Sequence, residues 1–379
     1  MDKLNYTLKS EEIQELKEKI RTIKRKVIRK LEKSRIIKRK RVVRSYSVLF
    51  QATVLYIIEK LSFQRLSDVM SIKYNVSMSD TSWKKQISKV APIIFEIMME
   101  LLNSQTQSNP NSILGHTSVY ALDATDIALE GKKGTILRAH TAYSLSECAS
   151  FNALIADIHT GESAKLFSVK AKSLYFADRA YGKTPQMGYI MMNNADFVFR
   201  FSPSHVKMFS DSKCTQQVDF ESLLSENDQI SSFECFFKDK RHIRKIRVII
   251  SLLPKDKVDS AIKRAKRKSI KKQCKISGKT ILFARYLFLA TSISGVHSDE
   301  DIIFAYRNRW QIELHFKRSK SLLRFHKLRR SSFSYAFNTV SAWLAVTAFV
   351  YYLFLPLFFH FSFVFSSFNA FSLASFLIS

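Results

Sequence analysis

Four polar residues near the end of the chain have a spacing that a helix would bring together. Tyr306, Arg309, Glu313 and Lys320 lie at offsets of 0, 3, 7 and 14 residues, so at about 100° per residue all four fall within about 60° on one helical face. Apolar residues gather on an adjoining sector and give this helix something to bury. Such a face suits a site for a metal ion and phosphate groups, because unpaired buried charges are costly. An ordinary solvated face with surface ion pairs is the alternative.

This pattern, Tyr-x2-Arg-x3-Glu-x6-Lys within YRNRWQIELHFKRSK, resembles the signature of IS4-type DDE transposases. The resemblance implies two upstream aspartates, the first in an Asp-x-Thr context and the second in an Ala-Asp-Arg-x-Tyr context. Both are present, as Asp123 in YALDATDIAL and Asp178 in FADRAYGK. The resemblance covers roughly residues 45 to 330. It implies an α/β fold with an RNase H-like catalytic core and an all-β insertion, preceded by an α-helical DNA-binding region.

The resemblance also implies the site. Asp123, Asp178 and Glu313 would be the catalytic residues and the ligands of two Mg²⁺ ions, for which Mn²⁺ can substitute. Carboxylate oxygens suit these hard cations, and two such ions activate the attacking hydroxyl and stabilise the leaving oxygen of a phosphodiester. Asp126 competes with Asp123, but residues three apart in a strand point to opposite faces, and the Asp-x-Thr pattern favours Asp123.

Around the metal ions, Arg309 and Lys320 would bind phosphates of the DNA, and Tyr306 would donate a hydrogen bond to a phosphate oxygen. Trp310 lies about 40° beyond the polar stripe. It could stack on a base or pack against the protein, and we favour packing.

The charge of the chain agrees with a nucleic-acid partner. Its 379 residues include 61 Lys and Arg against 32 Asp and Glu, a formal charge of +29, with a pI near 9.9. A polyanion would relieve this repulsion, so DNA is the first candidate partner and an anionic membrane surface the second. The four cysteines include no CxxC pair, which argues against a zinc site or a disulfide framework. Without a secretion signal, we expect a cytoplasmic, nucleoid-associated bacterial protein.

The first part of the chain reads as helical. Residues 8–45 are dense in Lys and Arg and predict a basic arm that neutralises phosphates. Two short helices around a turn then suggest a helix-turn-helix, with Ser79 or Asp80 as the cap of the second helix. Its Trp83, Lys84 and Lys85 would be available to DNA, with Lys84 and Lys85 as the predicted contacts. A plain helical bundle with surface lysines is the alternative.

Composition shifts divide the chain further. The polar SQTQSNPNS segment predicts a boundary near residue 112. Strand-like runs follow, and a helix-and-strand alternation after three strands is how an RNase H-like core begins. Apolar runs between Asp178 and Glu313 read as strands of the insertion. The predicted units are a helical DNA-binding region at 1–112, the first part of the core at 113–200, a β-rich insertion at 201–285, the second part of the core at 286–335, and an apolar tail at 336–379.

The tail departs from the rest of the chain, because no Lys, Arg, Asp or Glu follows Arg330 and phenylalanines crowd the segment. Three explanations are open: terminal helices that complete the core, a membrane segment, or translation out of frame after a lesion in the element. A frame-shifted tail could leave dimerisation or solubility defective and the enzyme inactive.

The resemblance implies a DNA transposase that performs Mg²⁺-dependent cleavage at insertion-sequence ends and strand transfer into target DNA, with hairpin formation as a family trait. Its partners would be double-stranded terminal inverted repeats and target DNA, bound by a homodimer in the synaptic complex, with no small-molecule substrate. Three alternatives are an RNase H-like nuclease that only cleaves, a repressor-like DNA-binding remnant, and a membrane protein.

Overall fold

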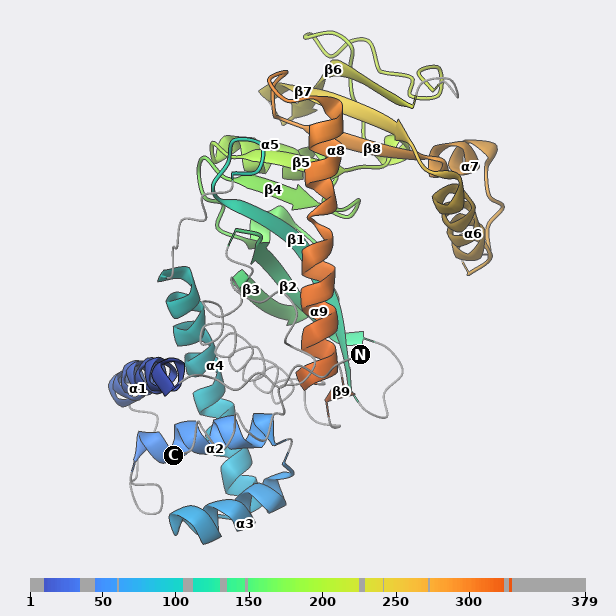
Figure 1. The fold of residues 1–379 in the computed structure, drawn as a ribbon. Helices are drawn as coiled ribbons and strands as arrows, with labels where there is room; N and C mark the ends of the chain where they lie inside the picture. The colour runs from blue at the N-terminus through green and yellow to red at the C-terminus, as the bar shows by residue number, and fades with distance from the viewer. Residues whose placement is uncertain are drawn as a thin grey trace.

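The computed structural model describes a group of N-terminal helices followed by one mixed sheet with helices on both faces (Figure 1). None of the helices within this described part is long and apolar enough to cross a membrane. The predicted tail at 336–379, with its three explanations, lies outside the described residues. Those described are 10–34, 45–59, 61–104, 112–129, 135–146, 149–224, 229–240, 242–271, 273–323 and 327–328.

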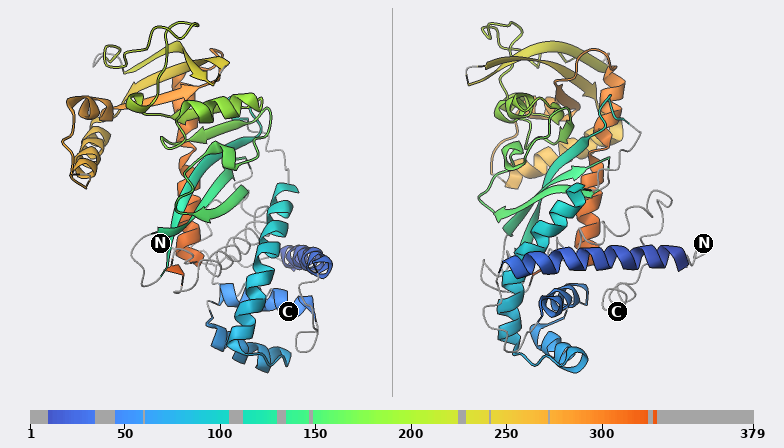
Figure 2. Two further views of the ribbon diagram at one scale, coloured as in Figure 1. Left: turned by 180° about the vertical axis from the view of Figure 1, so that it is seen from behind. Right: turned by 90° about the vertical axis from the view of Figure 1, so that its left-hand side faces the viewer.

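Within the described residues the N-terminal group contains four helices, and residues 10–34 of the predicted basic arm belong to it, whereas 8–9 and 35–44 lie outside the described residues. Ile23, Val27 and Leu31 follow one another at intervals of four residues and are buried, and Lys30 binds Glu100 of the last helix at 2.7 Å. Figure 2 shows the first helix crossing the fourth. One face of the expected arm is therefore committed to packing. The helices are α1 (Ser10–Lys33), α2 (Tyr46–Ile58), α3 (Phe63–Tyr74) and α4 (Asp80–Ser104).

The two helices around a turn that the sequence predicts are α3 and α4, which contact each other. Asn75 ends α3 in the left-handed conformation, with φ of 52°. The Ser79 hydroxyl accepts a hydrogen bond from the Ser82 N–H at 3.3 Å and caps α4. The expectation that Trp83 is available to DNA is wrong, because its side chain is fully buried. Lys84 and Lys85 are exposed.

The sheet has the strand order β3-β2-β1-β4-β5-β8-β7-β6, and β9 pairs with the end of β1. The first three strands are antiparallel, whereas β4 and β5 run parallel to β1. Helix α5 (Thr184–Met192) connects β4 to β5. Three antiparallel strands followed by a helix-and-strand alternation form the RNase H-like core that the sequence predicts. The core strands are β1 (Val119–Leu129), β2 (Thr135–Ser144), β3 (Ala149–Asp157), β4 (Leu174–Ala177), β5 (Asp196–Arg200) and the short β9 (Lys327–Leu328).

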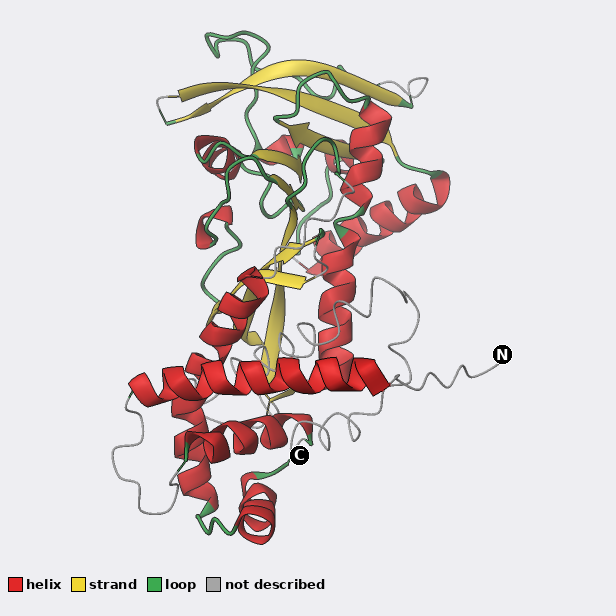
Figure 3. Cartoon of the chain, turned by 60° about the vertical axis from the view of Figure 1, so that its left-hand side comes forward, coloured by secondary structure: helices red, strands yellow, loops and turns green. Residues whose placement is uncertain are grey.

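Successive side chains of β4 point to opposite faces of the sheet, and both faces are covered. Leu174 and Phe176 pack with helix α8 (Asp299–Arg307), whereas Tyr175 and Ala177 pack on the other face with residues of α5. A strand buried on both faces must be apolar throughout, as LYFA is. Figure 3 shows these helices against the sheet and the N-terminal helices gathered at one end of it.

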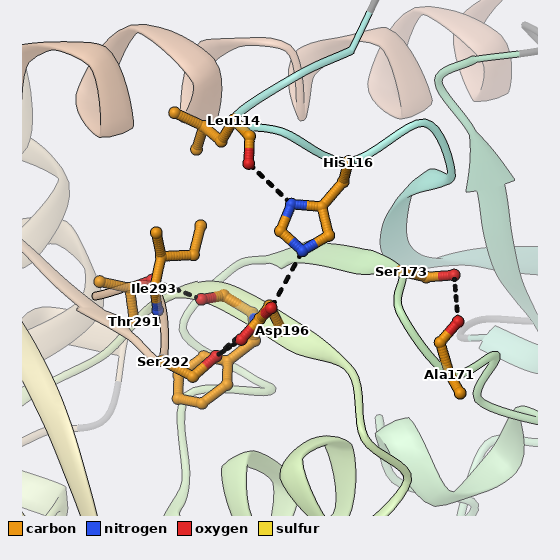
Figure 4. Close-up of polar contacts among 9 residues, drawn as sticks. Leu114, His116, Ala171, Ser173, Asp196, Thr291, Ser292 and Ile293 are labelled. Carbon is orange, nitrogen blue, oxygen red and sulfur yellow. Dashed lines mark hydrogen bonds and ion pairs between the residues drawn. The ribbon is translucent and has the colours of Figure 1, made fainter. Parts of the chain in front are cut away.

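A polar network ties together the start of β5, the end of β8 and the segment before β1 (Figure 4). The Nε2 atom of His116 lies 2.9 Å from Oδ2 of Asp196, and its Nδ1 lies 2.9 Å from the Leu114 carbonyl oxygen. Ser292 donates a hydrogen bond to the same aspartate at 2.7 Å. The hydrogen bond to Asp196 raises the pKa of His116, so both ring nitrogens can donate. The network anchors the chain directly before the strand that carries Asp123.

The predicted insertion extends the core sheet rather than standing apart from it. Its strands continue the sheet beyond β5 through β8, which pairs antiparallel with both β5 and β7. The described residues of the predicted insertion, 201–285, also include two α-helices. Residues 263–271 of the basic run lie in α6, and the ILFA part of an expected strand lies in α7, which Ser277 caps. The elements of the predicted insertion are β6 (Ile230–Asp239), β7 (His242–Leu252), α6 (Lys255–Lys271) and α7 (Gly278–Ala284), and β8 (Tyr286–Thr291) lies in the predicted second part of the core.

The single helix expected for the Tyr306 to Lys320 stripe is two helices, α8 and α9 (Trp310–Leu323). Between them, the Asn308 N–H donates to the Ala305 carbonyl and the Arg309 N–H donates to the Tyr306 carbonyl, both at 3.0 Å. These bonds span three residues instead of four, so the turn is tighter than an α-helix. The tight turn changes the angle about the helix axis between Tyr306 and the other three residues, which are Arg309, Glu313 and Lys320.

Candidate active site

The register between two parallel strands sets the relation of the two aspartates. Leu122 of β1 pairs with Ala177 of β4, and the next residues are Asp123 and Asp178. Val119 and Ala121, which share the face of Asp123, pack with α8 and α9. Both aspartates therefore lie on the sheet face that these helices cover, one within β1 and the other at the end of β4.

The Asp123 carboxyl lies in a desolvated and acidic environment. Its side chain is 19% exposed, and burial, with added repulsion from Asp178 and Glu162, raises its pKa to about 7. The Ala124 N–H at 2.8 Å and the charge of Arg309 oppose this shift. The charges of Asp123 and Asp178 thus act on one another, as expected for carboxylates that share a site.

Glu313 comes from the first turn of α9, which packs on β1. Its carboxylate binds the guanidinium of Arg309, and Nη1 of Arg309 lies 3.9 Å from Oδ2 of Asp123. Arg309 therefore links the acid on the helix to the acid on the strand. Its Nε atom is buried and has no hydrogen-bond partner among the described residues.

These residues have the donor set for a divalent cation, although they do not form a finished cage. No group of three or more His, Cys, Asp or Glu side chains in the described part of the chain is close enough to hold a metal ion as it stands. The Arg309 cation sits between Asp123 and Glu313, where a positive charge is favourable. All the available donors are carboxylate oxygens, which suit Mg²⁺ or Mn²⁺. The residues fit a metal ion once the Arg309–Glu313 pair opens.

Tyr306 does not face the carboxylates as its position in the stripe predicts. It is buried beside Phe176, and its hydroxyl donates a hydrogen bond to the Ala177 carbonyl at 3.2 Å. The expected contact with a phosphate would require this bond to break. In the structure Tyr306 instead fixes the end of β4, directly before Asp178.

Lys320 is half-buried on α9, and burial lowers its pKa while the nearby charges of Asp126 and Asp123 oppose that effect. It is therefore in electrostatic reach of the site. Asp126 itself is exposed and binds Nε of Arg138 at 2.9 Å on the neighbouring strand. Trp310 is 59% exposed, so the expectation that it packs against the protein is wrong.

Lys84 and Lys85 lie at the start of α4, beside α3. This end of the N-terminal group is the one furthest from the sheet (Figure 1). The structure does not bring these lysines to the carboxylates. As DNA contacts they would form a separate surface.

Sequence reasoning missed two charged residues close to the aspartates. Glu162 follows β3 and is half-buried, and burial followed by the charge of Asp178 raises its pKa. Arg200 ends β5, and burial followed by the charge of Arg179 lowers its pKa to about 10. Neither residue belongs to a motif, and only the sheet order brings them near Asp178.

Comparison with known proteins gives a consistent result. The transposase DDE domain family matches residues 114–353. The chain is 24% identical over 303 residues to a putative transposase InsL for insertion sequence element IS186A of Escherichia coli K12, covering 77% of this chain and 80% of the relative. It is 25% identical over 265 residues to a transposase for insertion sequence element IS421 of Escherichia coli, covering 67% and 70%.

Among solved structures, the chain is similar to a piggyBac transposase in a synaptic complex with hairpin DNA. The TM-score is 0.48 at 8% identity, and the match covers 97% of this chain and 79% of the other. The family match spans both aspartates and the Arg309–Glu313 pair. Enzymes of this family use divalent metal ions, in agreement with the oxygen donors of this site. The chain belongs to the DDE transposase family and is a DNA transposase.

Proposed function

We propose that Asp123, Asp178 and Glu313 hold two Mg²⁺ ions, for which Mn²⁺ can substitute, and that the enzyme cuts the ends of an insertion sequence and joins them to target DNA. The parallel register of β1 and β4 is the observation that carries this proposal, because it brings two acids from distant parts of the sequence to one face. Glu313 on the helix that covers this face supplies the third acid. When bound, the metal ions would activate the attacking hydroxyl and stabilise the leaving oxygen.

The cationic residues of the site would position the DNA. Arg309 can exchange Glu313 for a phosphate, to which its planar guanidinium can donate two parallel hydrogen bonds. Lys320 would hold a second phosphate near Asp123 as a point charge. Tyr306 supports the end of β4 and would reach a phosphate only after releasing Ala177. Lys84 and Lys85 would bind DNA away from the catalytic centre.

The acid with the raised pKa has a role of its own before the metal binds. Burial leaves Asp123 close to half-protonated near neutral pH. To hold a divalent ion, this carboxyl would have to be deprotonated, so metal binding would be coupled to proton release. Asp178, which accepts a hydrogen bond from the Ala180 N–H at 2.9 Å, is held in orientation by its own loop.

We further propose that the enzyme acts as a homodimer on paired terminal inverted repeats. The insertion-sequence transposases to which it is similar support this function, and the charge of +29 supports extensive DNA contact. No small molecule is required as a substrate.

The test uses purified full-length protein, duplex DNA that carries the ends of the element, and Mg²⁺. Asp123→Asn, Asp178→Asn and Glu313→Gln are each expected to reduce cleavage at least about 1000-fold while binding of the ends persists. Asp126→Asn is the matched control, since it lies on the same strand and pairs with Arg138 of the neighbouring strand. Cleavage at the wild-type rate by any of the three variants removes that residue from the site. Cleavage without joined products would identify a nuclease instead.

A further inference from the structure

Helix α6 is the most strongly charged element of the insertion, and the catalytic proposal leaves it without a role. Eight of its residues are Lys or Arg and two are Asp. All eight cationic side chains are exposed. Within the described part of the chain, only Lys257 among them forms an ion pair, with the adjacent Asp256 at 3.6 Å. A face with so little internal compensation attracts a polyanion.

The helix has two distinct faces. Its half-buried residues recur at helical spacing and line one side, where α6 contacts α7. Lys263, Arg267 and Lys271 follow one another at intervals of four residues on the opposite side. The apolar side is therefore used for packing, and the outward side is basic. The half-buried residues are Val258, Ala261, Ile262, Ala265 and Ser269.

The position of the helix links it to the catalytic centre. Figure 1 shows α6 and α7 projecting beyond the end of the sheet, with α6 level with the junction between α8 and α9. Figure 2 shows the same projection from behind. The charge of Arg264 on α6 interacts with the charge of Arg179, the residue that follows Asp178.

We propose that the basic face of α6 binds the phosphate backbone of the same DNA duplex whose scissile phosphate lies at Asp123 and Asp178. The helix rises about 24 Å from its first residue to its last, which equals about seven phosphate spacings of a DNA strand. Cations spread along such a length neutralise phosphates and do not contact base edges. This contact therefore increases the affinity for DNA and orients it without sequence preference.

This inference rests on the proposed catalytic function for the course of the DNA, but its test does not require cleavage. The triple variant Lys263→Gln, Arg267→Gln, Lys271→Gln removes three charges from exposed positions and retains residues that favour a helix. Binding of a labelled 40-base-pair duplex of mixed sequence is measured without metal ions at several salt concentrations. Each lost phosphate contact lowers the salt slope by about 0.9. We therefore expect the slope of log K against log salt to fall by about 2.7.

Between about 50 and 200 mM salt, the wild-type protein should then lose about 40-fold more affinity than the triple variant. The matched control is Lys207→Gln, Lys213→Gln, Lys238→Gln, which removes three exposed charges from other parts of the insertion. It should keep the wild-type slope. An unchanged slope in the α6 variant, or an equal fall in the control, overturns the proposal.

A cleavage assay tests whether α6 binds the same duplex that the catalytic site cleaves. With DNA that carries the element ends, the α6 variant should show a raised KM and an unchanged kcat at saturating DNA. A reduced salt slope with an unchanged KM would mean that α6 binds other DNA and would refute the shared duplex. If the wild-type protein cleaves nothing, the catalytic proposal fails, whereas the salt slopes still decide whether α6 contacts DNA.

Discussion

The guanidinium of Arg309 binds the carboxylate of Glu313, one helical turn further along the chain. The same guanidinium lies 3.9 Å from the carboxylate of Asp123. A cation from the protein thus occupies a position between two acids that are proposed to hold a metal ion. Metal ions and Arg309 cannot both satisfy Glu313 in this arrangement, so binding of a metal requires the ion pair to open.

Arg309→Ala should therefore bind Mn²⁺ more tightly and cut DNA more slowly than the wild-type protein. Removing the guanidinium frees Glu313 and removes a positive charge that repels the metal ion. Because Glu313 is 43% exposed, solvent screening limits the gain in Mn²⁺ affinity to about three- to tenfold. Titration followed by electron paramagnetic resonance measures the binding. Arg307→Ala, an exposed change two residues away, is the control and should leave Mn²⁺ affinity unchanged. Weaker binding by Arg309→Ala would mean that the guanidinium organises the carboxylates instead of competing for them.

The Tyr306 hydroxyl should matter for the site through the backbone. Tyr306→Phe keeps the ring beside Phe176 but leaves the Ala177 carbonyl without this donor, which should cost about 1–2 kcal/mol of unfolding free energy. Because Asp178 follows Ala177, we also expect slower cleavage. Denaturant unfolding and initial cleavage rates measure the two effects.

Tyr189→Phe is a matched control for this change, since the Tyr189 hydroxyl donates to the Phe167 carbonyl at 3.1 Å on the other side of the sheet. It should lower stability by a similar amount without slowing cleavage by the folded protein. Equal losses of cleavage in both variants would show that Tyr306 acts only through global stability.

The sequence predicted local features well where one physical rule dominated. The alternation of DATD placed Asp123 and Asp126 on different faces, and the structure pairs Asp126 with Arg138 on the neighbouring strand. The apolar run before Asp178 predicted a buried strand, which is β4. Ser79 was one of two predicted caps and is the one that accepts the N–H of Ser82.

Features that depend on pairing between distant segments were not predictable. The register that aligns Leu122 with Ala177 joins strands far apart in the sequence, and no local pattern specifies it. The approach of Glu162 and Arg200 to the aspartates follows from the sheet order alone. The break between α8 and α9 was missed because neither Gly nor Pro marks it, and the continuous spacing of the stripe favoured one helix.

Gly182 should be intolerant of a side chain. A Cβ atom on Gly182 would lie 2.1 Å from the carbonyl oxygen of Arg200 and 2.8 Å from Cα of Phe201, both on the backbone. Gly182→Ala therefore forces the loop after Asp178 away from β5, at a cost of about 1–3 kcal/mol, and should reduce cleavage further. Gly295→Ala is the control, because nothing lies within 4 Å of its Cβ position. Equal unfolding free energies for the two variants would contradict this account.

His140 should make the protein sensitive to acid. The ring is fully buried on β2, and neither ring nitrogen has a hydrogen-bond partner among the described residues. Burial, followed by the charge of Arg138, lowers the pKa of His140 from 6.5 to about 4, although Asp126 opposes the shift. The unfolded chain then binds a proton at a pH where the folded chain does not, so stability falls as pH drops from 6.5 to 4. The loss attributable to this group is at most about 3 kcal/mol.

His140→Leu should remove that part of the pH dependence. We expect the wild type to lose unfolding free energy relative to the variant as the pH falls, measured in urea between about pH 7 and 4.5, because only the wild type must keep a buried imidazole neutral. His205→Leu, a change at an exposed histidine that bonds Ser202, should follow the wild-type curve. A wild-type slope in His140→Leu would assign the acid sensitivity to other groups. The pair of His116 and Asp196 is not one of them over this range, because the raised pKa of His116 makes the pair more stabilising as the pH falls. Protonation of Asp196, whose pKa the His116 bond holds low, would weaken that pair only at still lower pH.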